Sequence, residues 1–197
     1  MVNAPASISR LLGQSEWGEL DADTFMRELA AAMAQELGCE RFAVRLVMDT
    51  RLGRTLKTVA LFDRALHGMP HVPDIIGDEV DAYLTTVSRS GGLVATEVAT
   101  ESRMPDPVRD TFAQCGVRSV LDVAISLNGL IYGSMGCEQV RRTVHWTPHQ
   151  VELLRRLAMK TAPALIRVMH KELTEPGDLW EPGPSYWLAP LVPPPAA

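Results

Sequence analysis

The chain has 197 residues and a formal net charge of −5 at pH 7, with 46% hydrophobic and 22% charged residues, proportions that are ordinary for a globular protein. The acidic charge argues against nucleic-acid binding, and no apolar run approaches the ~20 residues that a membrane-spanning helix needs. We therefore expect one domain with extensions, large enough to bury a sizeable core.

The N-terminus and the cysteines favour a cytoplasmic protein. Residues 1–9 lack both the basic and the apolar segment of a signal peptide. Three cysteines, Cys39, Cys115 and Cys137, cannot all pair, and none lies in a Cys-x-x-Cys spacing. We expect free thiols in a reducing compartment, acting as small buried hydrophobes, with a redox-active cysteine as the alternative.

The N-terminal third predicts an arm, a helix and a hairpin. Residues 1–20 show no clear period and are interpreted as an N-terminal arm. A helix is expected from Asp21 or Asp23 to about Leu37, because Asp is a favoured N-cap and Gly38 can end a helix. Two strands should come next, over residues 42–48 and 56–62, and then a loop over residues 66–77 that contains two prolines and two glycines.

The middle of the chain predicts two short helices. The first begins at Asp78 and runs to about Arg89, with Tyr83 on its apolar face. A short strand over residues 93–97 comes after it. The second helix begins at Asp106, has proline at its first helical position and carries Phe112 on its apolar face until Gly116 ends it.

Residues 118–139 carry the strongest hairpin signal in the chain. Two apolar runs flank Asn128-Gly129, and this pair favours a type I′ turn because both residues accept positive φ. Asp122 and Glu138 interrupt the apolar pattern. A carboxylate in an apolar strand is costly if it is buried unpaired, so each should have a partner or an open face.

The last helix should begin at a capping box, Thr147 to Gln150, and it carries two apolar stripes. Pro163 predicts a kink or an early stop. We expect the domain to span residues 21–172, and residues 173–197, rich in proline, to form an extended tail. With hairpins near both ends, the element order α-β-β-α-β-α-β-β-α predicts an α+β fold around an antiparallel sheet.

A family resemblance rests on the second hairpin and on the segment that leads into the last helix. The strand Ser-Val-Leu-Asp-Val-x-Ile, the strand Gly-x-x-Gly-Cys-Glu and the segment His145-Trp146-Thr147-Pro148 before a long helix are similar to the C-terminal half of a GAF domain. The chain resembles GAF domains of bacterial sensor kinases and cyclic-dinucleotide enzymes over roughly residues 24–168. The resemblance implies long terminal helices on one face of the sheet and a pocket under short helices and loops on the other.

Three charges inside the expected strands are candidate pocket residues, namely Arg45, Asp122 and Glu138. They are interpreted either as a buried arginine–carboxylate pair that joins strands or as an anchor for a charged group of a ligand. Candidate pocket walls are apolar or aromatic, and ordinary core packing is the alternative for them; they are Phe62, Leu66, Tyr83 and Phe112.

The resemblance implies two functions from different classes. The first is a ligand-sensing module in signal transduction with no catalytic activity of its own. The second is a thiol-dependent redox enzyme of the same fold, similar to free methionine sulfoxide reductases, using Cys115 or Cys137. No metal site is expected, because the pairs His67–His71 and His145–His149 do not each share a helix. For the sensing module no catalytic residue is expected, since Gly133-Ser134-Met135-Gly136 lies within a strand and is not a nucleophile elbow. The cofactor is left unnamed, since the motifs of bilin-binding and cyclic-nucleotide-binding members are missing.

The expected partners are a small-molecule ligand, a second copy of the chain and a signalling protein. The homodimer is predicted from the second apolar stripe on the last helix and the matching stripe on residues 25–37, since such helices can form a bundle across a two-fold axis.

Overall fold

The computed structural model describes residues 5–16, 20–50, 53–66, 72–89 and 91–174, with side chains at 49–50 and 169–174 left out. In these ranges the elements, in chain order, are α1 (Ala6–Glu16), α2 (Ala22–Leu37), β1 (Arg41–Thr50), β2 (Gly53–Asp63), β3 (Ile75–Ile76), α3 (Asp78–Arg89), β4 (Leu93–Ala95), the 3₁₀ helix η1 (Val98–Thr100), α4 (Asp106–Gln114), β5 (Ser119–Leu127), β6 (Leu130–Gln139) and α5 (Pro148–Thr174).

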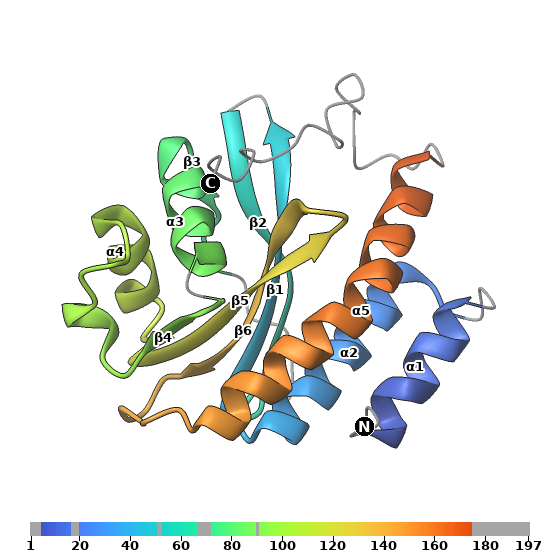
Figure 1. Ribbon diagram of the computed structural model, residues 1–197, viewed down its shortest axis with the longest axis horizontal. Coiled ribbons are helices and arrows are strands. Elements are labelled where there is room, and N and C mark those ends of the chain that lie inside the picture. The colour runs from blue at the N-terminus through green and yellow to red at the C-terminus, as the bar shows by residue number, and fades with distance from the viewer. Residues whose placement is uncertain (1–4, 17–19, 51–52, 67–71, 90, 175–197) are drawn as a thin grey trace.

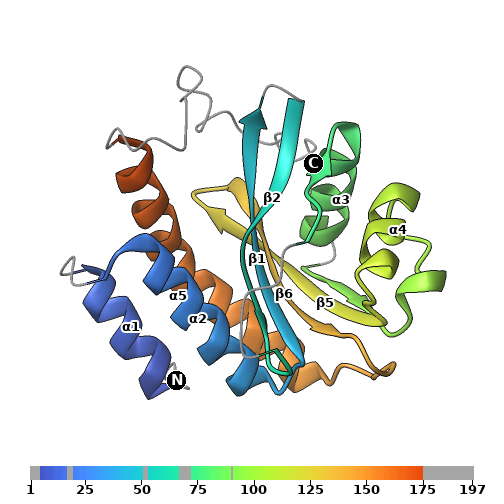
Figure 2. The same cartoon turned by 180° about the vertical axis from the view of Figure 1, so that it is seen from behind.

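A single antiparallel sheet organises the molecule. Its strand order is β3-β2-β1-β6-β5-β4, so the two long hairpins lie side by side and the two shortest strands form the edges. Helices α1, α2 and α5 lie on one side of the sheet, and α3 and α4 lie on the other (Figures 1 and 2). This is the α+β architecture that the sequence predicts.

The two faces of the sheet bury two separate apolar clusters. The larger one, here called the helix-side core, joins α1, α2 and α5 to one face and includes Phe25, Phe42 and Leu165. The smaller one, the pocket-side core, joins α3 and α4 to the other face and includes Tyr83 and Phe112. Because side chains alternate along a strand, neighbouring residues of β5 serve different cores.

The predicted turn and caps are confirmed. Asn128 and Gly129 have φ of 52° and 79°, as a type I′ turn requires. Asp21 caps α2 by accepting a 2.8 Å hydrogen bond from the Thr24 amide, and Gly38 ends that helix with a φ of 68°. In the capping box, the Gln150 amide donates to Thr147 Oγ1 at 3.2 Å, and the Thr147 amide donates to Gln150 Oε1 at 3.0 Å.

The N-terminal segment differs from the sequence-based interpretation. Residues 6–16 form a helix whose buried side chains are Ile8, Leu11 and Ser15. These positions have helical spacing, but one of the three is polar, so the apolar period is too sparse to stand out. Helix α1 packs against α2 and α5.

Pro163 does not end the last helix, so of the two predicted outcomes, a kink or an early stop, the early stop is wrong. Proline removes the hydrogen bond to the carbonyl of the residue four positions earlier, Met159. Both Pro163 and Met159 are exposed, so water can satisfy that carbonyl. The buried neighbours Ala162 and Leu165 hold the helix against the rest of the protein on both sides of the proline.

The second apolar stripe of α5 is buried within one chain. Leu157 is 1% exposed and Ala164 is 4% exposed, and both belong to the helix-side core together with residues of α1 and α2. The stripe therefore has a partner in its own chain and does not need a second copy to cover it.

A β-bulge in the first hairpin changes which residues of β2 face which core. Val44 pairs with Ala60, but Arg45 pairs with Thr58, so Val59 is an extra residue in β2. Leu56 therefore lies in the pocket-side core, whereas Ala60 and Phe62 pack in the helix-side core.

The remaining segments bear on three further expectations. The expected loop over residues 66–77 contains the two-residue strand β3. None of the helices in the described ranges is long and apolar enough to cross a bilayer. Residues 175–197, most of the expected tail, lie outside the described residues.

Candidate functional site

The candidate site is a buried charge cluster on the pocket side of the sheet. Arg45 comes from β1, Asp122 from β5 and Glu138 from β6, and they are 5%, 0% and 2% exposed. Arg45 Nη1 lies 3.4 Å from Asp122 Oδ2, and Arg45 Nη2 donates to Glu138 Oε1. The sequence left open which carboxylate would bind Arg45, and the structure shows that both do.

Two hydroxyl groups complete the environment of Asp122. The Tyr83 hydroxyl donates to Asp122 Oδ2, and Ser134 Oγ donates to the same oxygen at 3.2 Å. Among the described residues, no group donates to the buried Oδ1 atom. Burial raises the pKa of Asp122, and the opposing effects of Arg45, Tyr83 and Ser134 do not cancel this shift.

The pKa values of Tyr83 and Arg45 are also shifted from their ordinary values. Burial raises the pKa of the Tyr83 hydroxyl, and the charge of Asp122 adds to the shift, so Tyr83 stays a hydrogen-bond donor. Burial would lower the pKa of Arg45, but Glu138 and Asp122 outweigh it and raise the pKa, so the guanidinium stays charged.

Glycines in β6 make room for this cluster. A Cβ atom on Gly136 would collide with the Asp122 carboxylate and with the Leu121 carbonyl oxygen. A Cβ atom on Gly133, which has a φ of 159°, would overlap the backbone carbonyl of Arg45. The Gly-x-x-Gly pattern of the sequence thus lets the central strands approach the charged residues closely.

An aromatic pair covers the cluster. The guanidinium carbon of Arg45 lies 4.8 Å from the centroid of the Phe112 ring, a distance suited to a cation–π interaction. The Tyr83 and Phe112 rings are tilted by 46° with centroids 6.0 Å apart. The sequence predicted both as pocket residues, and the structure brings both to the cluster.

Phe62 and Leu66 are not brought to this site. Phe62 is partly buried in the helix-side core because the bulge at Val59 turns the second half of β2 over. Leu66 is 64% exposed. Sequence alternation cannot reveal a bulge at Val59, since an apolar residue fits either face.

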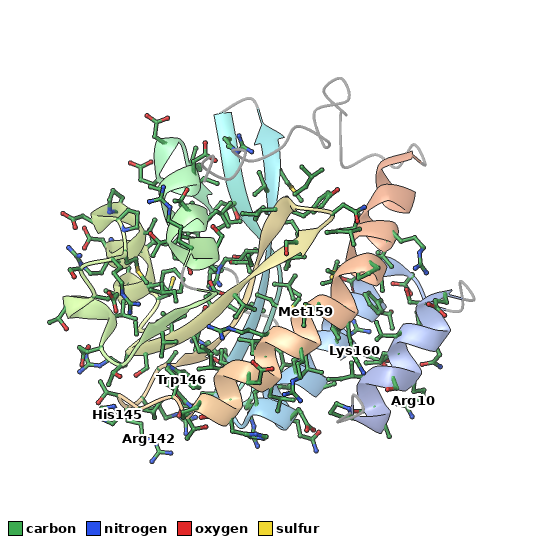
Figure 3. The ribbon with its side chains drawn as sticks, in the orientation of Figure 1. Arg10, Arg142, His145, Trp146, Met159 and Lys160 are labelled. Atoms are coloured by element: carbon green, nitrogen blue, oxygen red, sulfur yellow. The ribbon has the colours of Figure 1, made fainter. Side chains whose placement is uncertain are left out.

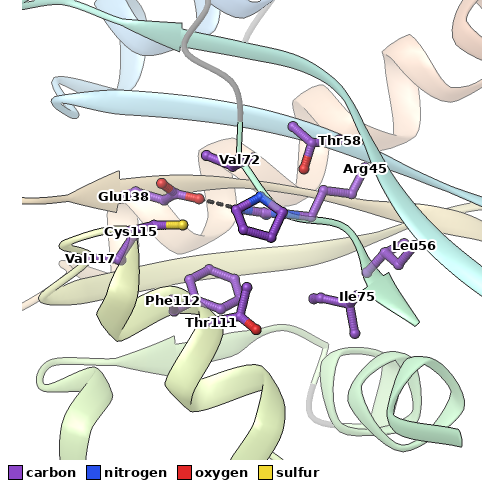
Figure 4. A pocket seen from close by; sticks show the side chains of 11 residues that line it. Arg45, Leu56, Thr58, Val72, Ile75, Thr111, Phe112, Cys115, Val117 and Glu138 are labelled. Atoms are coloured by element: carbon purple, nitrogen blue, oxygen red, sulfur yellow. Dashed lines mark hydrogen bonds and ion pairs between the residues drawn. The ribbon is translucent and has the colours of Figure 1, made fainter. Parts of the chain in front are cut away.

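A cavity opens beside the cluster (Figure 4). It is small, with room for about one water molecule. Its walls are mostly apolar and small polar side chains, and they include Arg45 and Glu138; the others are Leu56, Thr58, Val72, Pro73, Ile75, Thr111, Phe112, Cys115 and Val117. Asp122 and Tyr83, which were predicted as pocket residues, are not among the residues that line it; both instead contact the cluster. Thr58 and Thr111 were not predicted from the sequence, because only their place in the fold singles them out.

The thiols are distributed over both cores. Cys115 is partly exposed and lines the cavity near Glu138 (Figure 4), and burial raises the pKa of its thiol. Cys39 and Cys137 are buried together in the helix-side core, where burial and then Cys39 raise the pKa of Cys137. A raised pKa leaves less of the reactive thiolate.

A second ion pair lies at the end of the same face. Arg41 Nε donates to Asp63 Oδ2 at 2.5 Å, and Arg41 Nη1 donates to the Cys115 carbonyl at 2.9 Å. Burial opposes ionisation of Asp63, but Arg41 and the amides of Ala65 and Leu66 outweigh it and lower its pKa. This pair was not predicted from the sequence, although Arg41 and Asp63 are opposite each other in the hairpin.

Among the described residues, no group of three His, Cys, Asp or Glu side chains is placed to hold a metal ion. His145 Nδ1 lies 3.4 Å from Thr96 Oγ1, and His67 and His71 lie outside the described residues.

The family model for the GAF domain matches residues 21–165, so the chain belongs to the GAF family. This confirms the resemblance noted in the sequence. GAF domains are small-molecule-binding or chromophore-binding sensory modules of signalling proteins.

Solved GAF structures share the fold at low sequence identity. The blue-light-absorbing form of the PixJ GAF domain of Thermosynechococcus elongatus is 19% identical with a TM-score of 0.57, and the match covers 87% of this chain and 95% of that one. The GAF domain of an Acinetobacter phosphoenolpyruvate-protein phosphotransferase is 9% identical with a TM-score of 0.61, over 84% and 94% of the two chains. The dark state of JSC1_58120g3, which contains bound biliverdin, is 12% identical with a TM-score of 0.59, over 83% and 99%. No curated protein matches this chain.

Proposed function

We propose that this protein is a ligand-sensing regulatory module in signal transduction that has no catalytic activity of its own. The observation that carries the proposal is the cavity, whose wall includes two charged side chains, Arg45 and Glu138, that are at least nine-tenths buried. Buried charges that reach a cavity are suited to orient a polar ligand. The sensory role of the GAF family supports the same conclusion.

The size of the cavity limits the ligand. A tetrapyrrole such as the biliverdin bound to JSC1_58120g3 is far larger than a space for about one water molecule. A small ligand needs only a displacement of the rim, where Pro73 is exposed and Val72 and Thr111 are partly buried. We therefore propose a small ligand rather than a bilin.

The thiol-dependent redox enzyme is less well supported. Cys115 lies on the opposite side of the sheet from Cys39 and Cys137, and burial raises the pKa of Cys115 and Cys137. Cys39 is a neighbour of Cys137, but both are 0% exposed, so a substrate has no access to this pair. A redox enzyme needs a reactive thiolate and a resolving partner within reach. Inert thiols in a titration with a disulfide reagent would agree with the sensor, and a fast-reacting Cys115 would favour the enzyme.

Native mass spectrometry of the freshly purified full chain tests the proposed function. We expect an additional mass from a co-purified small molecule. The matched control is Val117→Phe, which fills the cavity without changing the charge of the cluster. An additional mass that persists in this variant would place the molecule elsewhere, and no molecule bound to the wild type under any growth condition would contradict the proposal.

We also propose that the module acts as a homodimer through its helix layer and passes its signal to a partner protein in the cytoplasm. Support comes from Met159, a large apolar side chain that is 68% exposed on α5, beside the exposed Lys160 (Figure 3). The acidic net charge favours a protein over nucleic acid as that partner.

Light scattering tests the homodimer. We expect Met159→Glu to dissociate it and Lys160→Glu to leave it intact. A wild-type monomer at micromolar concentration would contradict the proposal. Leu154→Glu is unsuited to this test, because Leu154 is 0% exposed in the helix-side core and the variant should unfold.

A further inference from the structure

The charges around the cavity are unbalanced. Among the described residues that line it, Arg45 is the only cation and Glu138 is the only anion. Asp122, directly behind Arg45, adds a second negative charge. One guanidinium thus serves two carboxylates, and the cluster carries a net charge of −1 among buried side chains when both carboxylates are ionised.

Glu138 keeps an acceptor that this cluster does not use. Its Oε1 atom accepts from Arg45 Nη2, so among the described residues the side-chain hydrogen bond of Glu138 uses only one of its two carboxylate oxygens. The side chain is 3% exposed and lines the cavity (Figure 4). A carboxylate oxygen in a dry site binds a charged donor strongly, because little water competes for it.

The same site is unfavourable for an anionic ligand. Both amino groups of the Arg45 guanidinium, Nη1 and Nη2, already face carboxylates. An anion beside Glu138 would bring a third negative charge into the same low-dielectric region, where like charges repel strongly. A ligand with one positive charge would instead bring the sum to zero.

The rest of the wall suits an apolar stem. Leu56, Ile75 and Val117 line the cavity, and the Phe112 ring already lies against the cation of Arg45. An aromatic ring attracts a ligand cation for the same reason that it attracts Arg45. The cavity has room for about one water molecule, so the charged group alone would fill it and a stem would lie where the rim is displaced.

We propose that this cavity binds a small organic cation, an ammonium or guanidinium group on a short apolar stem, with Glu138 Oε2 as its acceptor. This inference rests on the proposed function, since it names the ligand class of the same site. Cys115 and Thr111 lie at the rim, where the stem would enter.

Three probes of equal length and different charge test the proposal on the full chain. n-Butylammonium, n-butyramide and n-butyrate are titrated by calorimetry, and amide chemical shifts locate the site. We expect n-butylammonium to bind at least about tenfold more tightly than n-butyrate, with shifts centred on Phe112, Val117 and Glu138.

Two variants separate the cavity from the acidic surface. Glu138→Gln should lose the preference for the cation, and Val117→Phe should lose binding of all three probes. The second variant leaves every charge in place, so it remains informative if the first does not fold. Cation binding that survives Val117→Phe would be surface attraction and would overturn the inference.

The remaining outcomes distinguish this inference from the proposed function. Tighter binding of n-butyrate or n-butyramide in the cavity would overturn the cation inference and leave the sensor intact. The protein could also bind none of the probes but co-purify with an anion or a neutral molecule that Val117→Phe excludes. That result would likewise overturn the cation inference and leave the sensor intact. Binding of none of them and no co-purified molecule would overturn both.

Discussion

Arg41 and Arg45 lie on the same strand and face the same side of the sheet, yet their carboxylate partners behave differently. Asp63, bound to Arg41 at the end of the sheet, has a lowered pKa. Asp122, bound to Arg45 at the centre, has a raised pKa. Asp63 also accepts two backbone amides and has one arginine to itself, whereas Asp122 is completely buried and shares Arg45 with Glu138. The difference shows that an arginine does not ensure an easily ionised carboxylate where burial is complete.

The largest expected effect is the loss of Arg45. Arg45→Met would leave Asp122 and Glu138 buried without a cation, and we expect it to lower the free energy of unfolding by about 3–5 kcal/mol. The matched change Arg41→Met should lower it by about 1–3 kcal/mol, because the Arg41 side chain is 15% exposed and Asp63 keeps two backbone amide donors. Urea denaturation measures both. Equal losses would contradict the difference drawn between the two pairs.

Loss of the central aspartate should come next. Asp122→Ala removes the partner of Arg45, Tyr83 and Ser134, and we expect it to lower the free energy of unfolding by about 2–5 kcal/mol. Since Asp122 does not line the cavity, its effect on ligand binding should come only from altered placement of Arg45. A change in stability below about 1 kcal/mol, as at exposed positions, would show that Asp122 is not one half of a buried pair.

A substitution that adds bulk but no charge tests how tightly the central cluster is packed. Gly136→Ala would push a methyl group into the Asp122 carboxylate, and we expect it to lower the free energy of unfolding by about 1–3 kcal/mol. Gly116→Ala is a control away from the cluster, since nothing lies near its Cβ position; its φ of 75° gives it only a backbone strain. If Gly136→Ala raised stability, the close approach of β5 and β6 would have to be reconsidered.

The smallest expected effect is a change in the pH dependence of stability. The ordinary pKa of both aspartates is 3.8. The folded pKa of Asp63 is lower, so its contribution is present above pH 3.8 and is lost as the pH falls through the folded pKa. The folded pKa of Asp122 is higher, so its contribution to stability is fully present below pH 3.8 and is lost as the pH rises through the folded pKa.

Two isosteric variants test these opposite signs. Asp63→Asn should flatten the acid side of the stability curve, and Asp122→Asn should flatten the part above pH 3.8. Denaturation curves measured across the acid range give both slopes. The same sign of change in the two variants would contradict the opposite pKa shifts.

Local patterns in the sequence predicted much of this fold. The Asn128-Gly129 turn was predicted, but the register of β5 and β6 also depends on a bulge at Tyr132, because Ser126 pairs with Ile131 and Ile125 pairs with Gly133. This bulge puts Glu138 and Asp122 on the same, pocket-side face, and the sequence did not reveal it. The alternation of β1 placed Arg45 on that face too. The sharing of one arginine could not be predicted, since it depends on how β1 packs beside β6.

The predictions that were wrong or incomplete have a common cause. The facing of Phe62 depended on a bulge, the end of α5 on packing around Pro163, and α1 on a surface formed by α2 and α5. Each of these features is decided by contacts between distant parts of the chain. A window of neighbouring residues carries little information about them.

Because of the bulge at Val59, the two halves of strand β2 have different roles and can be substituted independently. Its first half, with Leu56 and Thr58, supplies the wall of the cavity, and its second half, with Ala60 and Phe62, supplies the helix-side core. Substitutions in the first half can alter ligand preference while the stability supplied by the second half is conserved. Deleting one residue at the bulge would join the two halves in one alternation and exchange the side chains of one half between core and cavity. Length changes at this point should therefore be tolerated far less than substitutions.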